Sequence, residues 1–126
     1  MNKHYDKGEW NKAIEYYEKS LEISEKLGDV QRIVYTYGNL GLVYMDKGER
    51  NKAIQYYEKS LKIFKQLDDK INIARTLLNI GHTIQKKGEY EKALEIYSEA
   101  QNVCSKTQDN MLLKEINKRI AKIKME

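Results

Sequence analysis

The stretch Lys47–Leu61 reads KGERNKAIQYYEKSL, and forty residues earlier Lys7–Leu21 reads KGEWNKAIEYYEKSL. The two stretches differ at only two positions, and a third copy begins KGEYEKALEIYSEA at Lys87. Internal repetition with a period of roughly 20–50 residues is typical of an array in which each repeat packs on the next. The recurrence therefore predicts a stacked repeat fold, and it predicts the general kind of function more readily than the partner.

The composition favours helices in every repeat. The chain has 126 residues, which is ordinarily one domain, and it contains no proline while 33% of its residues are charged. The formal net charge is +4, with 23 basic and 19 acidic residues interspersed. A mixed surface of this kind is usually a solvated exterior, whereas a dedicated nucleic-acid binder concentrates its basic residues on one face. We expect a single all-α domain over residues 1–126 that binds no nucleic acid.

The single cysteine and the lack of long apolar runs indicate where the protein resides. Cys104 cannot form an internal disulfide, and we expect it to be a small buried residue. The opening MNKHYDKGEW has no apolar segment, and the longest apolar run elsewhere is Leu42–Met45. We therefore expect a cytoplasmic protein that does not enter a membrane.

Each repeat reads as two helices separated by turn residues. Glycine recurs in each Lys-Gly-Glu turn, and glycine readily takes the left-handed backbone that ends a helix. Asn11 and Asn51 follow these turns at positions where they could cap the next helix. Asp29, Asp69 and Asp109 mark the second turn of each repeat and are also expected helix caps.

These residues resemble the tetratricopeptide repeat family in its forty-residue form. The first-helix pattern of the family matches Tyr37, Leu40, Gly41 and Tyr44, and aliphatic versions of it occur at Leu77, Ile80, Gly81 and Ile84. The second-helix pattern matches Ala53, Tyr57 and Ser60, and again Ala93, Tyr97 and Ala100. The proline that usually closes the repeat is absent. The resemblance implies a right-handed α-solenoid of antiparallel helix pairs, in which small residues bring helices close together and tyrosines fill the seams.

The repeat boundaries follow from the period. We expect a partial first repeat over residues 1–28, a second over 29–68, a third over 69–108 and a capping helix over 109–126. Apolar surface on the helix from Asn11 to Leu27 then lacks an upstream partner. Three explanations stay open: the chain is a piece of a longer array, this edge forms a homodimer, or a disordered end tolerates the exposure.

The first helix of each repeat carries a polar column opposite its packing stripe. Helical spacing places Tyr35, Asn39 and Leu42 together, and the same offsets give Arg75, Asn79, His82 and Lys86. Arg119 belongs to the capping helix, whose apolar stripe is rotated. The family resemblance implies that these columns line a concave groove that holds a peptide of a partner protein. The tyrosines at 17, 44, 57 and 97 are expected in the core, which leaves Tyr5 and Tyr35 for recognition.

Asn39 and Asn79 are the central candidates. A side-chain amide offers both a donor and an acceptor, which matches what a peptide backbone presents. The alternative is that both amides bond a neighbouring helix. The cations at 75, 86 and 119 favour an acidic or carboxylate-ended ligand. The sequence has no phosphate loop, no metal-ligand spacing and no nucleophile elbow, so we expect a binding module without enzyme activity, cofactor or metal. Self-assembly through the repeat ends is the alternative function.

Overall fold

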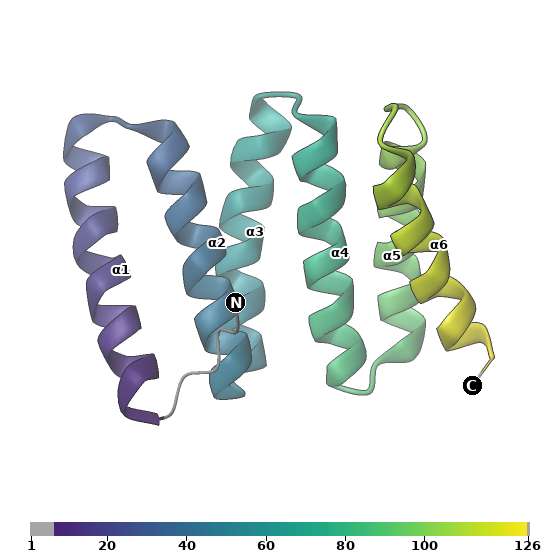
Figure 1. The fold of residues 1–126 in the computed structure, drawn as a ribbon, viewed down its shortest axis with the longest axis horizontal. Helices are drawn as coiled ribbons and strands as arrows, with labels where there is room; N and C mark the ends of the chain where they lie inside the picture. The colour runs from purple at the N-terminus through teal and green to yellow at the C-terminus, as the bar shows by residue number, and fades with distance from the viewer. Residues whose placement is uncertain (1–6, 126) are drawn as a thin grey trace. The chain divides into compact units, whose positions relative to one another are not determined.

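The computed structural model describes residues 7–125, and this part of the chain is helical apart from short turns (Figure 1). The helices are α1 Lys7–Leu27, α2 Val30–Lys47, α3 Arg50–Gln66, α4 Lys70–Lys86, α5 Tyr90–Cys104 and α6 Asn110–Lys124. Residues 7–125 contain no strand, so the predicted all-α class is confirmed. Within these residues, no helix combines the length and apolar character that crossing a membrane requires.

Aspartate side chains begin three of the helices, as predicted. Each accepts a hydrogen bond from the backbone N–H three residues later: Asp29 from Arg32 at 3.2 Å, Asp69 from Asn72 at 3.3 Å and Asp109 from Leu112 at 3.0 Å. These bonds satisfy amides that have no partner within the helix. Asp29, Asp69 and Asp109 are therefore the N-caps of α2, α4 and α6.

The glycine turns have the predicted backbone, but the predicted asparagine caps are wrong. Gly48 and Gly88 have φ angles of 89° and 85°, in the left-handed region that favours glycine. After Gly48 the helix restarts at once, because the backbone N–H of Ala53 already donates to the carbonyl of Glu49 at 3.1 Å. Asn51 consequently lies inside α3. Asn11 lies inside α1, where its side-chain oxygen accepts a hydrogen bond from Lys47 at 3.2 Å.

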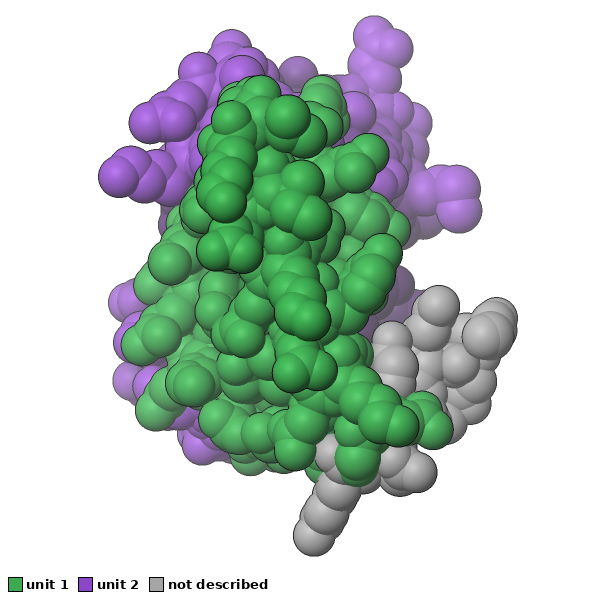
Figure 2. All heavy atoms as spheres, turned by 90° about the vertical axis from the view of Figure 1, so that its left-hand side faces the viewer, with its two compact units in different colours: residues 1–60 green, residues 61–126 purple. Residues whose placement is uncertain are grey.

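The chain divides into two compact units, residues 1–60 and residues 61–126, shown green and purple in Figure 2. We call them unit 1 and unit 2, and the division falls inside α3. In unit 1, α1 and α2 form an antiparallel pair joined by the turn at Gly28 and Asp29 (Figure 1). The buried apolar residues of this unit are Ile14, Val34, Leu40, Val43, Tyr44, Ala53 and Tyr57.

A glycine in unit 1 lets a tyrosine ring lie directly against a helix backbone. A Cβ atom added to Gly41 would lie 2.5 Å from Cε1 of Tyr57, whose side chain is only 3% exposed. Tyr44 stacks on Tyr56 with ring centroids 5.6 Å apart. The expected combination of a small residue for close approach and an aromatic residue to fill the seam is confirmed here.

Unit 2 contains the end of α3 together with α4, α5 and α6. Its buried core is Ile73, Ala74, Leu77, Ala100, Cys104, Leu112 and Ile116, so Cys104 is buried as predicted. The glycine–tyrosine contact recurs: a Cβ on Gly81 would lie 2.6 Å from Cε1 of Tyr97, which is fully buried. Helix α6 buries Ile116 and Ile123 while Asn117 and Lys124 are exposed. It therefore packs only part of its surface, as predicted for the last helix.

Candidate functional site

In unit 1, the candidate residues Tyr35, Asn39 and Leu42 lie on the accessible side of α2. Tyr35 is 71% exposed, Leu42 is 50% exposed and Asn39 is half-buried, whereas Leu40 and Tyr44 on the other side are buried. The side-chain amide of Asn39 makes no hydrogen bond within residues 7–125. All three side chains can therefore reach a ligand.

A pocket of about 560 Å³ lies between α1 and α2. Tyr35 and Asn39 line it together with Tyr16 and Tyr17, whose rings meet edge to face at 5.6 Å. Tyr17 was predicted to be a core residue, but it is half-buried. Unlike Tyr57 and Tyr97, it has no glycine-bearing helix against its ring in the described part of the chain. Tyr5, the other expected recognition tyrosine, lies outside the described residues.

In unit 2, Arg75 and Asn79 lie exposed on α4. A guanidinium nitrogen of Arg75 lies 3.7 Å from a carboxylate oxygen of Asp109, the residue that caps α6. The Asn79 side chain makes no hydrogen bond among residues 7–125, although its backbone carbonyl accepts one from Thr83 at 2.9 Å. Arg75 is thus partly engaged by the protein, while the Asn79 amide is available.

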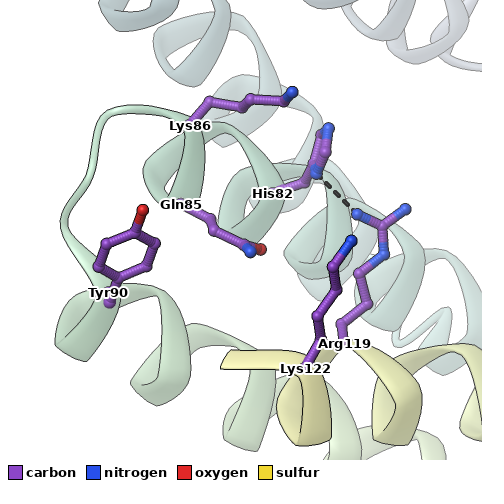
Figure 3. Close-up of a pocket in the computed structure, with 6 residues that line it drawn as sticks. All are labelled: His82, Gln85, Lys86, Tyr90, Arg119 and Lys122. Carbon is purple, nitrogen blue, oxygen red and sulfur yellow. Dashed lines mark hydrogen bonds between the residues drawn. The ribbon is translucent and has the colours of Figure 1, made fainter. Parts of the chain in front are cut away.

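The other candidates on α4 line a second pocket, which lies entirely within unit 2. It has a volume of about 310 Å³ and is lined by His82, Gln85, Lys86, Tyr90, Arg119 and Lys122 (Figure 3). These residues come from the end of α4, the start of α5 and the second half of α6. We call this the cationic pocket, because three of its six lining side chains are Lys or Arg and none is a carboxylate.

A short hydrogen bond between Arg119 and His82 joins two walls of the cationic pocket. Nη1 of Arg119 lies 2.7 Å from Nδ1 of His82 (Figure 3), while Nε of Arg119 donates to Glu115 at 3.0 Å. A guanidinium can only donate, so Nδ1 must accept and the imidazole is neutral with its proton on Nε2. Burial lowers the pKa of His82 first of all, and the positive charges of Arg119 and Lys86 lower it further.

The buried residue Tyr97 fixes the side-chain amide of Gln85, another polar group of the pocket. The hydroxyl of Tyr97 donates to the side-chain oxygen of Gln85 at 2.8 Å. Because that oxygen is the acceptor, the Gln85 amide keeps two N–H groups for other partners. Burial raises the pKa of Tyr97, so the hydroxyl remains a donor at neutral pH. The amide is therefore held in one orientation from within the core.

The structure brings three of the predicted site residues together in the cationic pocket, namely His82, Lys86 and Arg119. Sequence reasoning missed Gln85 and Lys122, although each lies three residues after a candidate on the same helix, where side chains share a face. Tyr90 carried no such signal, because the equivalent positions of the other copies hold Arg50 and Trp10, so no residue type recurs there. Arg119 faces His82 even though the stripe of α6 departs from that of the other first helices.

Within residues 7–125, no group of three or more His, Cys, Asp or Glu side chains could hold a metal ion. The candidate sites consist of amides, hydroxyls and cations, which are groups that bind and orient a ligand.

Comparison with known families identifies the repeats. A tetratricopeptide repeat model matches residues 4–66, and a second tetratricopeptide repeat model matches residues 74–107. No curated protein sequence matches the chain.

Solved structures show the same fold. The apo form of RapI is similar over 93% of this chain with a TM-score of 0.71 and 24% identity, and the chain spans about half of RapI, 49% of its length. The N-terminal domain of stress-induced protein-1 from C. elegans is similar over 86% of this chain and 95% of that domain, with a TM-score of 0.56 and 17% identity. At these identities the likeness concerns the fold alone, and it agrees with the predicted helix-pair solenoid.

Proposed function

This chain belongs to the tetratricopeptide repeat family, and from that premise we propose that it captures an extended or partly helical peptide of a partner protein, using the accessible face of α2 within unit 1 and that of α4 within unit 2. The repeats and the fold support a protein–protein interaction module in general. The proposal adds the binding mode. It takes residues 29–68 and 69–108 as the two full repeats, with 109–126 as the capping helix.

The observation that carries this proposal is the pair Asn39 and Asn79. They occupy the same repeat position, forty residues apart, on accessible helix faces. Neither side-chain amide bonds a neighbouring helix within residues 7–125, which was the alternative use for them. An unpaired amide can give one donor and one acceptor to the backbone of an extended peptide. Two such amides at equivalent positions are suited to hold the backbone rather than a particular side chain.

The charges near Asn79 favour an acidic or carboxylate-ended segment. Lys86 and Arg119 line the cationic pocket, and Arg75 is 60% exposed despite its contact with Asp109. Charge complementarity of this kind contributes chiefly to specificity and to the rate of association. We propose a cytoplasmic binding module that works without catalysis and without a cofactor.

A selection with a phage-displayed library of random 12-residue peptides tests the proposal. Peptides enriched on the full chain are synthesised and titrated against it by calorimetry. Replacing both asparagines, as Asn39→Ala with Asn79→Ala, should weaken these peptides by about tenfold or more, because the peptide groups lose partners. The melting temperature should stay nearly unchanged, since neither amide makes a hydrogen bond in the described structure.

Asn102→Ala is the matched control. Asn102 is an exposed asparagine on α5, so its replacement removes the same chemical group from another face. Equal affinities for the double variant, the control and the unmodified chain would show that the asparagines do not hold the peptide.

Exposed apolar residues on α1 favour self-association as a second candidate function. Tyr16, Ile23 and Leu27 are 69%, 56% and 73% exposed. Ile14, by contrast, is buried, so a charge placed there would disturb the fold rather than an interface. Sedimentation equilibrium separates the two functions: a dimer of the unmodified chain that dissociates in Ile23→Glu would support assembly, and a monomer at all concentrations would reject it.

A further inference from the structure

We propose that the cationic pocket of unit 2 binds a phosphoryl group, carried by a phosphorylated side chain of the partner segment. The pocket is the proposed binding site of the phosphoryl group. The assignment of this group to a peptide of a partner protein rests on the proposed function, whereas the expectation that the pocket binds phosphate does not.

Uncompensated positive charge is the first argument. Lys86, Arg119 and Lys122 line the pocket, and no carboxylate does. Among residues 7–125, neither lysine is held in an ion pair. Arg119 alone has an acidic partner, Glu115, which is bonded to its Nε. Figure 3 shows Lys122 extending beside Arg119 toward α4. This excess of positive charge attracts an anion even while His82 is neutral.

The neutral groups of the pocket are also arranged as donors. The Gln85 oxygen is occupied by Tyr97, which leaves the amide N–H groups of Gln85 to face a ligand. The Nδ1 atom of His82 is occupied by Arg119, so its proton is on Nε2. Tyr90, which is 49% exposed, adds a hydroxyl group. A ligand with several acceptor oxygens therefore suits such a site.

A phosphoryl group matches this pocket better than a carboxylate does. It carries a charge of about −1.5 to −2 at neutral pH and three acceptor oxygens, whereas a carboxylate carries one charge and two oxygens. Because Arg119 is paired with Glu115, the charges of Lys86 and Lys122 remain uncompensated, and a single carboxylate would offset only one of them. The geometry therefore points to a dianion.

The bond between Arg119 and His82 couples anion binding to protonation. The charged groups that line the pocket with His82 are Lys86 on its own helix and Arg119 and Lys122 on α6, with Glu115 bonded to Arg119, while α5 contributes Tyr90. Protonation of His82 removes the acceptor at Nδ1, and it adds a positive charge among cations. A bound dianion offsets that repulsion, so binding should raise the apparent pKa of His82.

Nuclear magnetic resonance of the full chain with inorganic phosphate as probe tests the site. Phosphate is compared with acetate and with chloride at equal ionic strength. We expect saturable shifts at His82, Gln85 and Tyr90 with phosphate, and a higher apparent pKa for the His82 ring when phosphate is present. Shifts no larger than those with chloride would overturn the proposal, and equal affinity for acetate would overturn its preference for a dianion.

Two charge-neutralising variants on the same helix separate the pocket from general electrostatics. Lys122→Gln should weaken phosphate binding by about two- to fivefold, which is the range for losing one exposed charged partner. Lys114→Gln removes the same charge from an exposed position of α6 outside the pocket and should leave binding unchanged. Equal weakening in both variants would mean that net charge, rather than this site, attracts phosphate.

Peptides identify the carrier of the phosphoryl group. An acetylated and amidated Gly-phosphoserine-Gly peptide is compared with its serine and glutamate versions and with inorganic phosphate. Tighter binding of the phosphoserine peptide supports a phosphorylated partner, whereas equal binding of inorganic phosphate supports the site but assigns it to small phosphate compounds. The double asparagine variant and the unmodified chain distinguish the two proposals. In the variant, retained phosphate binding together with loss of the selected peptides supports both. In the unmodified chain, absent phosphate binding while those peptides bind rejects only this inference.

Discussion

Replacing Gly81 with alanine should leave the protein less stable than the same change at an open helical position, even though alanine is the better helix former. The added Cβ would lie 2.6 Å from Cε1 and 2.7 Å from Cδ1 of Tyr97, which is closer than such atoms can approach. The ring has little room to move, because Tyr97 is fully buried and its hydroxyl is bonded to Gln85. Either the ring or the backbone of α4 must shift.

Gly38 offers a control for the same substitution. It lies inside α2, and a Cβ added there would meet no atom within 4 Å. Gly38→Ala should therefore show only the gain in helix propensity, about 1 kcal/mol. Gly81→Ala gains the same amount but also suffers overpacking of about 1–3 kcal/mol. The difference between the two variants cancels the propensity and should be about 1–3 kcal/mol, with Gly81→Ala the less stable.

Urea unfolding followed by circular dichroism measures both variants, and a double-mutant cycle with Tyr97→Leu assigns the cause. Leucine removes the ring atoms that the new methyl group would strike, so Gly81→Ala should no longer be costly in that background. Equal stability of Gly38→Ala and Gly81→Ala, or an unchanged cost of Gly81→Ala after the ring is removed, would refute the close packing of α4 on Tyr97.

Two further predictions concern caps and buried tyrosines. Asp69→Ala should cost about 1 kcal/mol in urea unfolding because a helix cap is lost, whereas Glu89→Ala, whose side chain makes no cap bond to α5, should stay within about 0.5 kcal/mol; equal costs would contradict the capping role. Burial raises the pKa of Tyr57 above its usual value, so above about pH 10 this residue ionises in the unfolded chain before it does so in the folded chain. Its contribution to stability should therefore be fully present below pH 10 and decline above it; tyrosinate absorbance at 295 nm that rises for all tyrosines together before unfolding would contradict this.

The fold was predictable because its determinants are local and repeated. A period of forty residues, the glycines at 48 and 88 and the aspartates at the other turns define where helices end and begin. The asparagine caps were mispredicted because a glycine turn can restart a helix after a single residue, and nothing in the letters around Asn51 distinguishes the first helical residue from the second. Errors of this size do not alter which faces are buried.

The cationic pocket was less predictable, because it depends on hydrogen bonds between helices. Spacing along α4 places His82 and Lys86 on one face, but it does not reveal that Arg119 of α6 donates to His82. That contact joins residues 37 positions apart, which is not the repeat period of forty. The period of forty makes Arg119 the equivalent of Asn79, and it does not predict that Arg119 contacts His82.

The departure of α6 from the repeat is what makes the pocket possible. By the period, Asn117 and Lys124 take the places of Leu77 and Ile84, and both are exposed. With those positions polar, the buried side of α6 is carried by Leu112, Ile116 and Ile123 instead. Since three residues advance a helix by nearly one turn, Arg119 and Lys122 then share one side, and that side faces His82 and Gln85. The proposed phosphate site therefore depends on residues of α6 that differ from their repeat equivalents, since Arg119 and Lys122 stand where the preceding repeat has Asn79 and His82.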